Sequence, residues 1–306
     1  MKFKKLAILL LSIMLLFTSC VKDSSAEEGF TVIGLNFPSF DLLRTLTEGT
    51  DTKVSMLLPL GSESHSYEPT PQDVIKLSKT ELFVYTGGES DEWVKGVLNT
   101  LDNPINTFIL IDEVPSINEA VSEGMEKKGD DEIDEHVWTS LSNEKALALS
   151  LSEKLSTLDS ENSDVYRANA ESYTFKLDKL TSEYEEVIKK GKRNVLVFAD
   201  RFPLSHFVHE FNLDFYAAFP GCAHESEASA KTVAFLIDKV KEEHIPVVFH
   251  IELSDEKLAK MISAETGAVV REWNTAHNVT KKQFEEGITY LDLMKANLSI
   301  LKEALD

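Results

Sequence analysis

Histidine is the residue type with the clearest chemical potential in this sequence, and three of its eight histidines stand in loops beside expected strand ends. His65 lies in GSESHSYEPTPQD, His136 in DEHVWTS and His277 in NTAHNVT. Neutral imidazoles that converge from different loops are a common way of holding a borderline metal such as zinc. The three are far apart in sequence, and no compact C-x-x-C or H-E-x-x-H motif is present. A metal site therefore depends on the fold that brings these loops together.

The second cysteine and several other histidines are interpreted as structural. Cys222 and His224 have a C-x-H spacing that could hold a metal, but a small buried thiol and an ordinary loop histidine are the simpler interpretation. His250 lies inside an apolar strand and is expected in the core, whereas His209 and His244 are expected at the surface.

Strands and helices alternate twice along the chain, which indicates what positions these loops. β-branched and apolar runs bounded by Gly, Pro or polar residues predict eight strands, at residues 30–36, 54–58, 82–85, 107–111, 195–199, 214–217, 247–251 and 268–272. Helical spacing of apolar residues fills the intervals. Strands separated by helices form a parallel sheet with helices on its faces. Such sheets bind ligands beyond the carboxyl ends of their strands.

One predicted helix is unusually long. Residues 161–190 contain no Gly or Pro, and apolar residues recur in them at helical spacing. A helix of that size is about 45 Å long, more than one small lobe needs. We therefore predict an α/β fold of two lobes, each a mainly parallel sheet flanked by helices, joined by one long rigid helix. The expected domains are an N-terminal lobe over residues 30–160, the linking helix over 161–190 and a C-terminal lobe over 191–306.

The first residues have the order of a targeting segment. Residues 1–19 begin with three lysines, continue in an apolar run and end in small residues, as in a secretory signal peptide. Cys20 then follows in a pattern similar to a bacterial lipobox, whose cysteine becomes the lipidated N-terminus. Residues 20–29 are expected to be the lipidated cysteine and a polar tether, and the alternative is a plain signal peptide cut nearby. This pattern predicts an extracytoplasmic protein, lipid-anchored to the bacterial cell membrane.

The composition excludes other kinds of protein. Lys and Arg number 31 against 52 Asp and Glu, which gives a formal net charge of −21. A nucleic-acid partner is not expected, because phosphate binding needs clustered Lys and Arg. Two cysteines among 306 residues build no disulfide scaffold. The acidic stretch 118–135 is interpreted as a solvated loop without a role in gathering metal.

Four segments together resemble a known family. HSYEPTPQDVIKLSKTELFVYTGGESDEWV, DEHVWTSLSN, the stretch from ESEASAKTVAFLIDKV to SAETGAVV, and YLDLMKANLSILKEAL follow one another in the family's order. The family is that of the zinc and manganese solute-binding lipoproteins of ATP-binding-cassette (ABC) importers, in the cluster that has a rigid linking helix. The resemblance runs from about residue 30 to the end. It implies a monomer that hands metal to an importer permease and its ATPase.

The same resemblance implies a set of ligands. The family's first two histidine ligands correspond to His65 and His136. Its third ligand follows the first strand of the second lobe, where the sequence reads VLVFADRFPLSHF. Asp200 is the matching carboxylate, although Arg201 beside it could pair with it instead, and His206 is the alternative. The fourth ligand, usually a carboxylate after the last strand, is expected to be replaced by His277.

This ligand set indicates what the site does. Three imidazoles and one carboxylate complete a tetrahedral shell, whereas a catalytic zinc keeps an open position for water. We therefore expect a protein that holds metal, not an enzyme. Nitrogen-rich ligation favours Zn²⁺ over Mn²⁺, which prefers oxygen ligands. The alternatives are a manganese-specific binding protein, an adhesin with a structural metal, or a secreted metallohydrolase.

Overall fold

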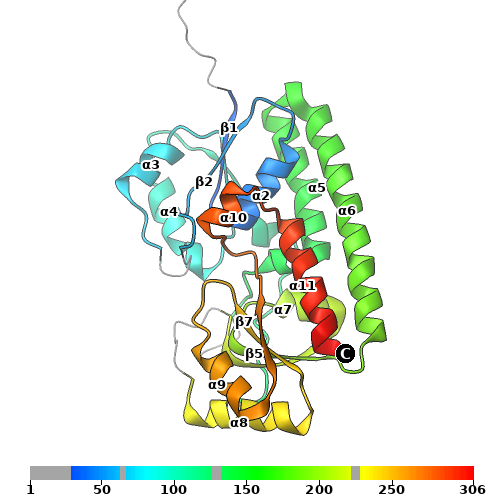
Figure 1. The fold of residues 1–306 in the computed structure, drawn as a ribbon. Coiled ribbons are helices and arrows are strands. Elements are labelled where there is room, and N and C mark those ends of the chain that lie inside the picture. The colour runs from blue at the N-terminus through cyan, green and yellow to red at the C-terminus, as the bar shows by residue number, and fades with distance from the viewer. Residues whose placement is uncertain (1–28, 63–66, 126–131, 222–227) are drawn as a thin grey trace, which may run out of the picture.

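The computed structural model describes residues 29–62, 67–125, 132–221 and 228–306. Its elements form two lobes, each built on a four-stranded sheet (Figure 1). Within these residues no helix is long and apolar enough to cross a membrane. Several features singled out from the sequence lie outside the described residues, namely the expected signal peptide, Cys20, His65, Cys222 and His224.

The first lobe contains a parallel sheet in the order β2-β1-β3-β4. Its strands are β1 (Thr31–Gly34), β2 (Lys53–Met56), β3 (Leu82–Tyr85) and β4 (Asn106–Ile109). The helices between them are α2 (Phe37–Leu46), α3 (Pro71–Leu77) and α4 (Glu92–Leu98). Every residue of β3 is buried, as expected for a central strand with helices on both faces.

The second lobe repeats this arrangement, with a parallel sheet in the order β6-β5-β7-β8. Its strands are β5 (Val195–Phe202), β6 (Asp214–Pro220), β7 (Val247–Ile251) and β8 (Val269–Trp273). Its helices are α7 (Ser205–Phe211), α8 (Ala230–Glu242) and α9 (Lys257–Thr266), and α10 (Lys281–Glu285) follows the last strand. The predicted fold class is thereby confirmed.

The order of the second sheet creates a place for a ligand. The chain leaves β5 toward β6 at one edge and leaves β7 toward β8 at the other. The connections therefore separate at the carboxyl ends of β5 and β7, which are neighbours in the sheet. Such a switch point is where open α/β sheets bind ligands.

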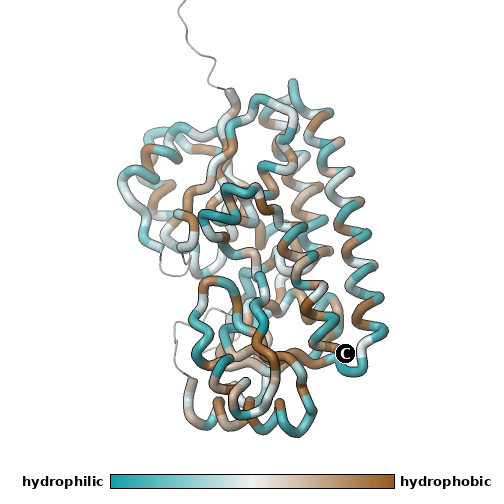
Figure 2. The backbone as a smooth tube through the Cα atoms, viewed as in Figure 1, coloured by the Kyte–Doolittle hydropathy of each residue, from teal (hydrophilic) through white to brown (hydrophobic). Residues whose placement is uncertain are grey.

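A long helix, α6 (Ser163–Lys190), connects the lobes and lies beside α5 (Leu141–Leu158) and α11 (Tyr290–Leu305) along the length of the molecule (Figure 1). At ~1.5 Å per residue it extends about 42 Å. The Tyr173 hydroxyl on α6 donates to Glu144 Oε1 on α5 at 2.9 Å, and the Tyr184 hydroxyl donates to the Met294 carbonyl on α11 at 2.6 Å. Hydrophobic residues recur along α6 and α11 between hydrophilic ones (Figure 2).

The lobes share one hydrophobic core. A single cluster of buried side chains includes Val32 of β1, Phe249 of β7 and the buried face of α6 from Tyr166 to Tyr184. Separating the lobes would expose this apolar surface to water, with a free-energy cost of about 25 cal/mol per Å². Packing through α6 therefore favours a fixed relation between the lobes over a wide hinge motion.

Candidate metal centre

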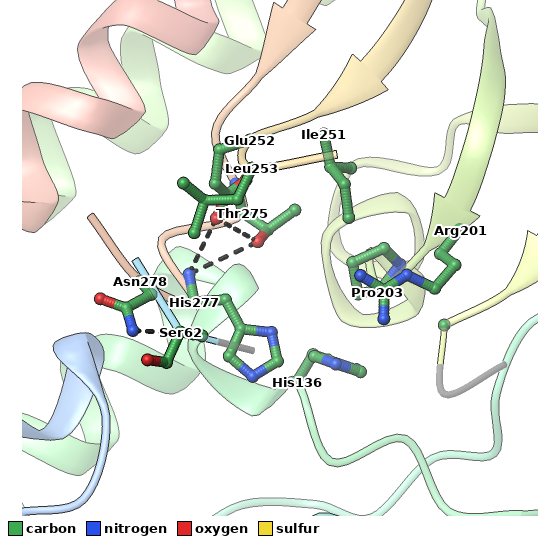
Figure 3. A pocket seen from close by; sticks show the side chains of 11 residues that line it. Ser62, His136, Arg201, Pro203, Ile251, Glu252, Leu253, Thr275, His277 and Asn278 are labelled. Atoms are coloured by element: carbon green, nitrogen blue, oxygen red, sulfur yellow. Dashed lines mark hydrogen bonds between the residues drawn. The ribbon is translucent and has the colours of Figure 1, made fainter. Parts of the chain in front are cut away.

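A small hollow lies beyond the carboxyl ends of β5, β7 and β8, between the two lobes (Figure 3). Its volume of about 20 Å³ suits a single ion or water. The first lobe contributes Ser62 and His136 to its wall. The second contributes the rest, namely Arg201, Pro203, Gly221, Ile251, Glu252, Leu253, Thr275, His277 and Asn278.

His136 is completely buried and precedes a short 3₁₀ turn, Val137–Thr139, that leads into α5. Its Nδ1 atom lies 2.7 Å from Asp134 Oδ1, which also accepts the His136 backbone N–H at 2.8 Å. Since a carboxylate can only accept, Nδ1 carries the proton and the neutral ring keeps its lone pair on Nε2. A histidine held by a carboxylate in this way is typical of metal ligands.

The charges around His136 set its pKa and that of its partner. Burial opposes protonation of His136, but the carboxylates of Asp134, Glu135 and Glu119 outweigh burial and raise the pKa of His136. Burial likewise favours neutral Asp134, but the charge and hydrogen bond of His136 lower the pKa of Asp134 to about 2. These carboxylates therefore stabilise positive charge at His136.

His277 reaches the hollow from the second lobe, in the loop after β8. Its ring centroid lies 5.3 Å from that of His136, with the planes inclined at 77° (Figure 3). The indole of Trp138 packs edge-on against both rings, at 5.3 Å from His277 and 5.6 Å from His136. The structure thus brings together two of the predicted ligands from opposite lobes.

The predicted third ligand is engaged elsewhere. The Asp200 side chain does not line the hollow. Its Oδ1 accepts the Arg201 N–H at 2.8 Å, and its Oδ2 accepts the Ile251 N–H at 3.1 Å and the Ser254 hydroxyl. These bonds connect the end of β5 to the turn after β7. It is the neighbouring side chain, Arg201, that lines the hollow.

The alternative third ligand is also engaged. His206 is buried at the start of α7, with Nε2 3.1 Å from the Asp134 carbonyl and Nδ1 3.1 Å from Asn143 Nδ2. With Nε2 donating and Nδ1 accepting, both ring nitrogens are satisfied. Burial lowers the pKa of His206, although the negative charge of Asp134 opposes this shift. The structure does not bring Asp200 or His206 to the hollow with His136 and His277.

The loop that precedes the first predicted ligand reaches the hollow as well. Asn278 Nδ2 donates to the carbonyls of Pro59 at 3.0 Å and Ser62 at 2.9 Å. Gly61 N–H donates to the Val279 carbonyl at 3.0 Å. Among the residues that the structure describes, no three His, Cys, Asp or Glu side chains form a metal-binding group. His65 falls outside that set.

Two acidic residues at this site, Glu252 and Asp134, were not predicted from the sequence. Glu252 directly follows β7 and lines the hollow, and Asp134 holds His136. Burial raises the pKa of Glu252 to about 7, against hydrogen bonds from Thr275 and His277 that lower it. The position of Glu252 at the carboxyl end of a buried strand was the available signal. For Asp134, the signal was an acid two residues before a candidate ligand.

Three histidines interpreted as structural occupy the expected places. His250 is buried in β7, with Nδ1 3.0 Å from the Ile251 carbonyl. His209 and His244 are exposed. None of the three lines the hollow.

Comparison with known proteins identifies a family. The model of the family described as "Zinc-uptake complex component A periplasmic" matches residues 37–304. The high-affinity zinc uptake system protein ZnuA of Bacillus subtilis is 25% identical over 295 residues, which cover 94% of this chain and 92% of that protein. The manganese ABC transporter substrate-binding lipoprotein PsaA of Streptococcus mitis is 26% identical, covering 99% of both.

A third relative has a solved structure. The zinc-binding lipoprotein AdcA of Streptococcus pneumoniae is 26% identical over 99% of this chain, which spans 61% of the length of AdcA. The crystal structure of its Zn(II)-bound ZnuA-like domain superimposes with a TM-score of 0.76 at 25% identity, covering 91% of this chain and 99% of the domain.

Proposed function

Since this chain belongs to the family of zinc-uptake complex component A proteins, we propose that it binds Zn²⁺ outside the cytoplasm and delivers it to an ABC importer. The observation that carries this proposal is the meeting of His136 and His277, from opposite lobes, at an ion-sized hollow. The family takes its description from uptake, and its members are transport components, not enzymes.

The choice of metal follows from the ligand atoms. Two imidazoles at one hollow favour Zn²⁺, whereas Mn²⁺ is held better by oxygen-rich sites. The zinc-named relatives ZnuA and AdcA support this choice. The manganese relative PsaA makes Mn²⁺ the competing substrate to test.

The ligand set that we propose begins with His65, His136 and His277. His65 is carried over from the family resemblance. The hydrogen bond from Asn278 to the Ser62 carbonyl supports it, because Ser62 lies at the hollow and only three residues before His65 in the chain. Asp200 or His206 would complete the shell only by giving up the hydrogen bonds that each now makes within the protein.

Metal release is proposed to need only local rearrangement. Ligands on both lobes let the metal connect them, and the shared core along α6 opposes a wide swing. Movement of the two ligand-bearing loops relative to each other would open the shell.

The protein's placement is also part of the proposal. Residues 1–19 would be removed as a signal peptide, and lipidated Cys20 would hold the chain at the membrane through the tether 20–29. The lobes would extend over residues 30–160 and 191–306, on either side of the helix 161–190. The partners would be the permease and ATPase of the importer, with the binding protein acting as a monomer.

A competitive titration tests the binding step. The purified metal-free protein would be titrated with Zn²⁺ and with Mn²⁺ against a chromophoric chelator at neutral pH. We expect one Zn²⁺ bound per chain and preferred over Mn²⁺. His136→Ala and His277→Ala should each weaken binding at least tenfold, and the exposed control His244→Ala should not. Equal binding by all three variants would refute the site.

A genetic experiment tests the transport step. Deletion of the gene should abolish growth and zinc accumulation when a zinc chelator is present, and added Zn²⁺ should restore growth. A strain that carries His136→Ala should behave like the deletion. Normal zinc accumulation in the deletion strain would contradict the role in uptake.

A further inference from the structure

The loop that carries His277 has an unusual backbone. Ala276, directly before His277, has φ = 60°, in the left-handed region that residues other than glycine seldom adopt. Its side chain is completely buried. Such a conformation persists only where the surroundings hold it, so the direction of the His277 side chain depends on what fixes the residues on either side of Ala276.

One carboxylate binds both of those residues. Glu252 Oε2 accepts the Thr275 N–H at 2.7 Å, and Glu252 Oε1 accepts the Thr275 hydroxyl at 2.6 Å. Oε1 also accepts the His277 N–H at 3.1 Å (Figure 3). The Glu252 carboxylate is therefore bonded to the residues directly before and after Ala276. Hydrogen bonds to a charged acceptor are stronger than those between neutral groups.

Other contacts hold the loop at different points. The Thr275 carbonyl accepts from Trp138 Nε1 at 2.9 Å, and the Asn274 N–H donates to Asn297 Oδ1 at 2.9 Å. These bonds fix the start of the loop, before Ala276. Glu252 differs because it also bonds the peptide of His277 itself.

We infer that Glu252 is a positioning residue for metal binding, which holds the His277 imidazole in its ligating place without being a ligand. Both Glu252 oxygens already accept hydrogen bonds from the loop that carries His277. The inference rests on the proposed function, since it takes His277 as a ligand of Zn²⁺.

The test compares Glu252→Gln with a matched control. Glutamine has nearly the same shape, but its amide NH₂ would face a backbone N–H, so the hydrogen bond to Thr275 N–H or to His277 N–H is lost. Zn²⁺ affinity of the full chain should fall 10- to 100-fold, as for other residues that orient a metal ligand. Glu256→Gln, four residues later at the start of α9 and paired with Lys260 at the surface, should retain wild-type affinity. Wild-type affinity in Glu252→Gln would overturn the inference.

A double-mutant cycle separates positioning from direct ligation. If Glu252 acts through His277, then Glu252→Gln should weaken Zn²⁺ binding no further in a His277→Ala background. Additive losses would show that Glu252 acts independently of His277 and would overturn the inference. The visible absorption spectrum of bound Co²⁺ should also change in Glu252→Gln and stay unchanged in Glu256→Gln.

A milder variant guards against misfolding. Thr275→Val removes the hydroxyl bond to Glu252 and the long 3.4 Å bond that the hydroxyl accepts from the His277 N–H. It leaves both backbone bonds to Glu252, so it should fold and weaken Zn²⁺ binding less than Glu252→Gln. Failure of the wild-type chain to bind Zn²⁺ would refute the proposed function itself. Binding by the wild type with no loss in either variant would refute only the role of Glu252.

Discussion

The indole N–H of Trp138 donates to the carbonyl of Thr275 at 2.9 Å, across the two lobes. Trp138 stands two residues after His136, and Thr275 stands two residues before His277. The two ligand-bearing segments are therefore bonded directly to each other. The same indole packs on both imidazole rings, so one side chain contacts both predicted ligands.

Trp138→Phe should loosen this contact. The substitution leaves a buried carbonyl without its donor, which costs on the order of 1–3 kcal/mol. We expect unfolding in urea at a lower midpoint, and a smaller rise in melting temperature on adding Zn²⁺. Trp93→Phe, on α4 away from the hollow, is the control for loss of an indole. If Zn²⁺ raised the melting temperature of Trp138→Phe as much as that of the wild type, the bond would not contribute to metal binding.

Asp134→Asn should weaken metal binding without unfolding the chain. The carboxylate holds the proton on His136 Nδ1 at 2.7 Å, and an amide holds it less firmly because it has no charge. Loss of such an orienting partner reduces metal affinity 10- to 100-fold. Competitive Zn²⁺ titration measures the change, with the exposed Asp112→Asn as control. Equal affinities for Asp134→Asn and the wild type would be inconsistent with this role.

The Glu144 carboxyl makes stability depend on pH. Burial raises the pKa of Glu144 from its ordinary value of 4.5 to about 8, with a further contribution from Asp41, while the Tyr173 hydrogen bond opposes the shift. The folded protein therefore keeps a proton that the unfolded chain releases, and this stabilisation is lost as the pH rises from about 4.5 to 8. Each pH unit in this window costs up to ~1.4 kcal/mol.

Glu144→Gln tests this dependence, because glutamine retains the acceptor for Tyr173 and does not titrate. Urea unfolding at several pH values from 5 to ~8 should show a shallower loss of stability in the variant than in the wild type. The exposed Glu171→Gln should follow the wild type. Parallel curves for Glu144→Gln and the wild type would contradict the assignment.

Asn278→Ala should affect both stability and metal binding. Its amide donates to Pro59 and Ser62, and its Oδ1 accepts the Val279 N–H at 2.7 Å. Loss of these buried bonds should cost ~1–3 kcal/mol in chemical unfolding. Zn²⁺ affinity should also decrease, because the segment before His65 loses two of its bonds to the second lobe and keeps the one from Gly61 to Val279. Asn106→Ala, which removes one exposed bond to Glu81, should cost less and leave Zn²⁺ affinity intact.

Several elements could be predicted from local sequence. Thr70 followed by Pro71 is a local signal for a helix start, and α3 begins there with the Thr70 side chain accepting the Asp73 N–H. The absence of Gly and Pro in 161–190 predicted α6. Such features depend on neighbours in the chain and on the periodicity of apolar residues, so one sequence is sufficient to find them.

The residue at which a strand ends, and the side chain that its end presents to the site, depend on the tertiary structure. Side chains alternate between the faces of a strand, so a shift of one residue exchanges which side chain reaches a site. The register between β5 and β6 shifts between Phe198 and Arg201, and β5 continues to Phe202, beyond its predicted end at residue 199. Asp200 consequently bonds to the turn after β7, while Arg201 lines the hollow.

The sequence by itself determined the two α/β lobes, the helix between them and the loops that carry His136 and His277. It did not determine how Glu252 and Asp134 hold those histidines, because these contacts join segments whose approach depends on the sheet order and on the packing of the lobes. Local patterns decide which elements form. Side-chain partners at the metal centre are decided only when the carboxyl ends of β5, β7 and β8 come together with the first lobe.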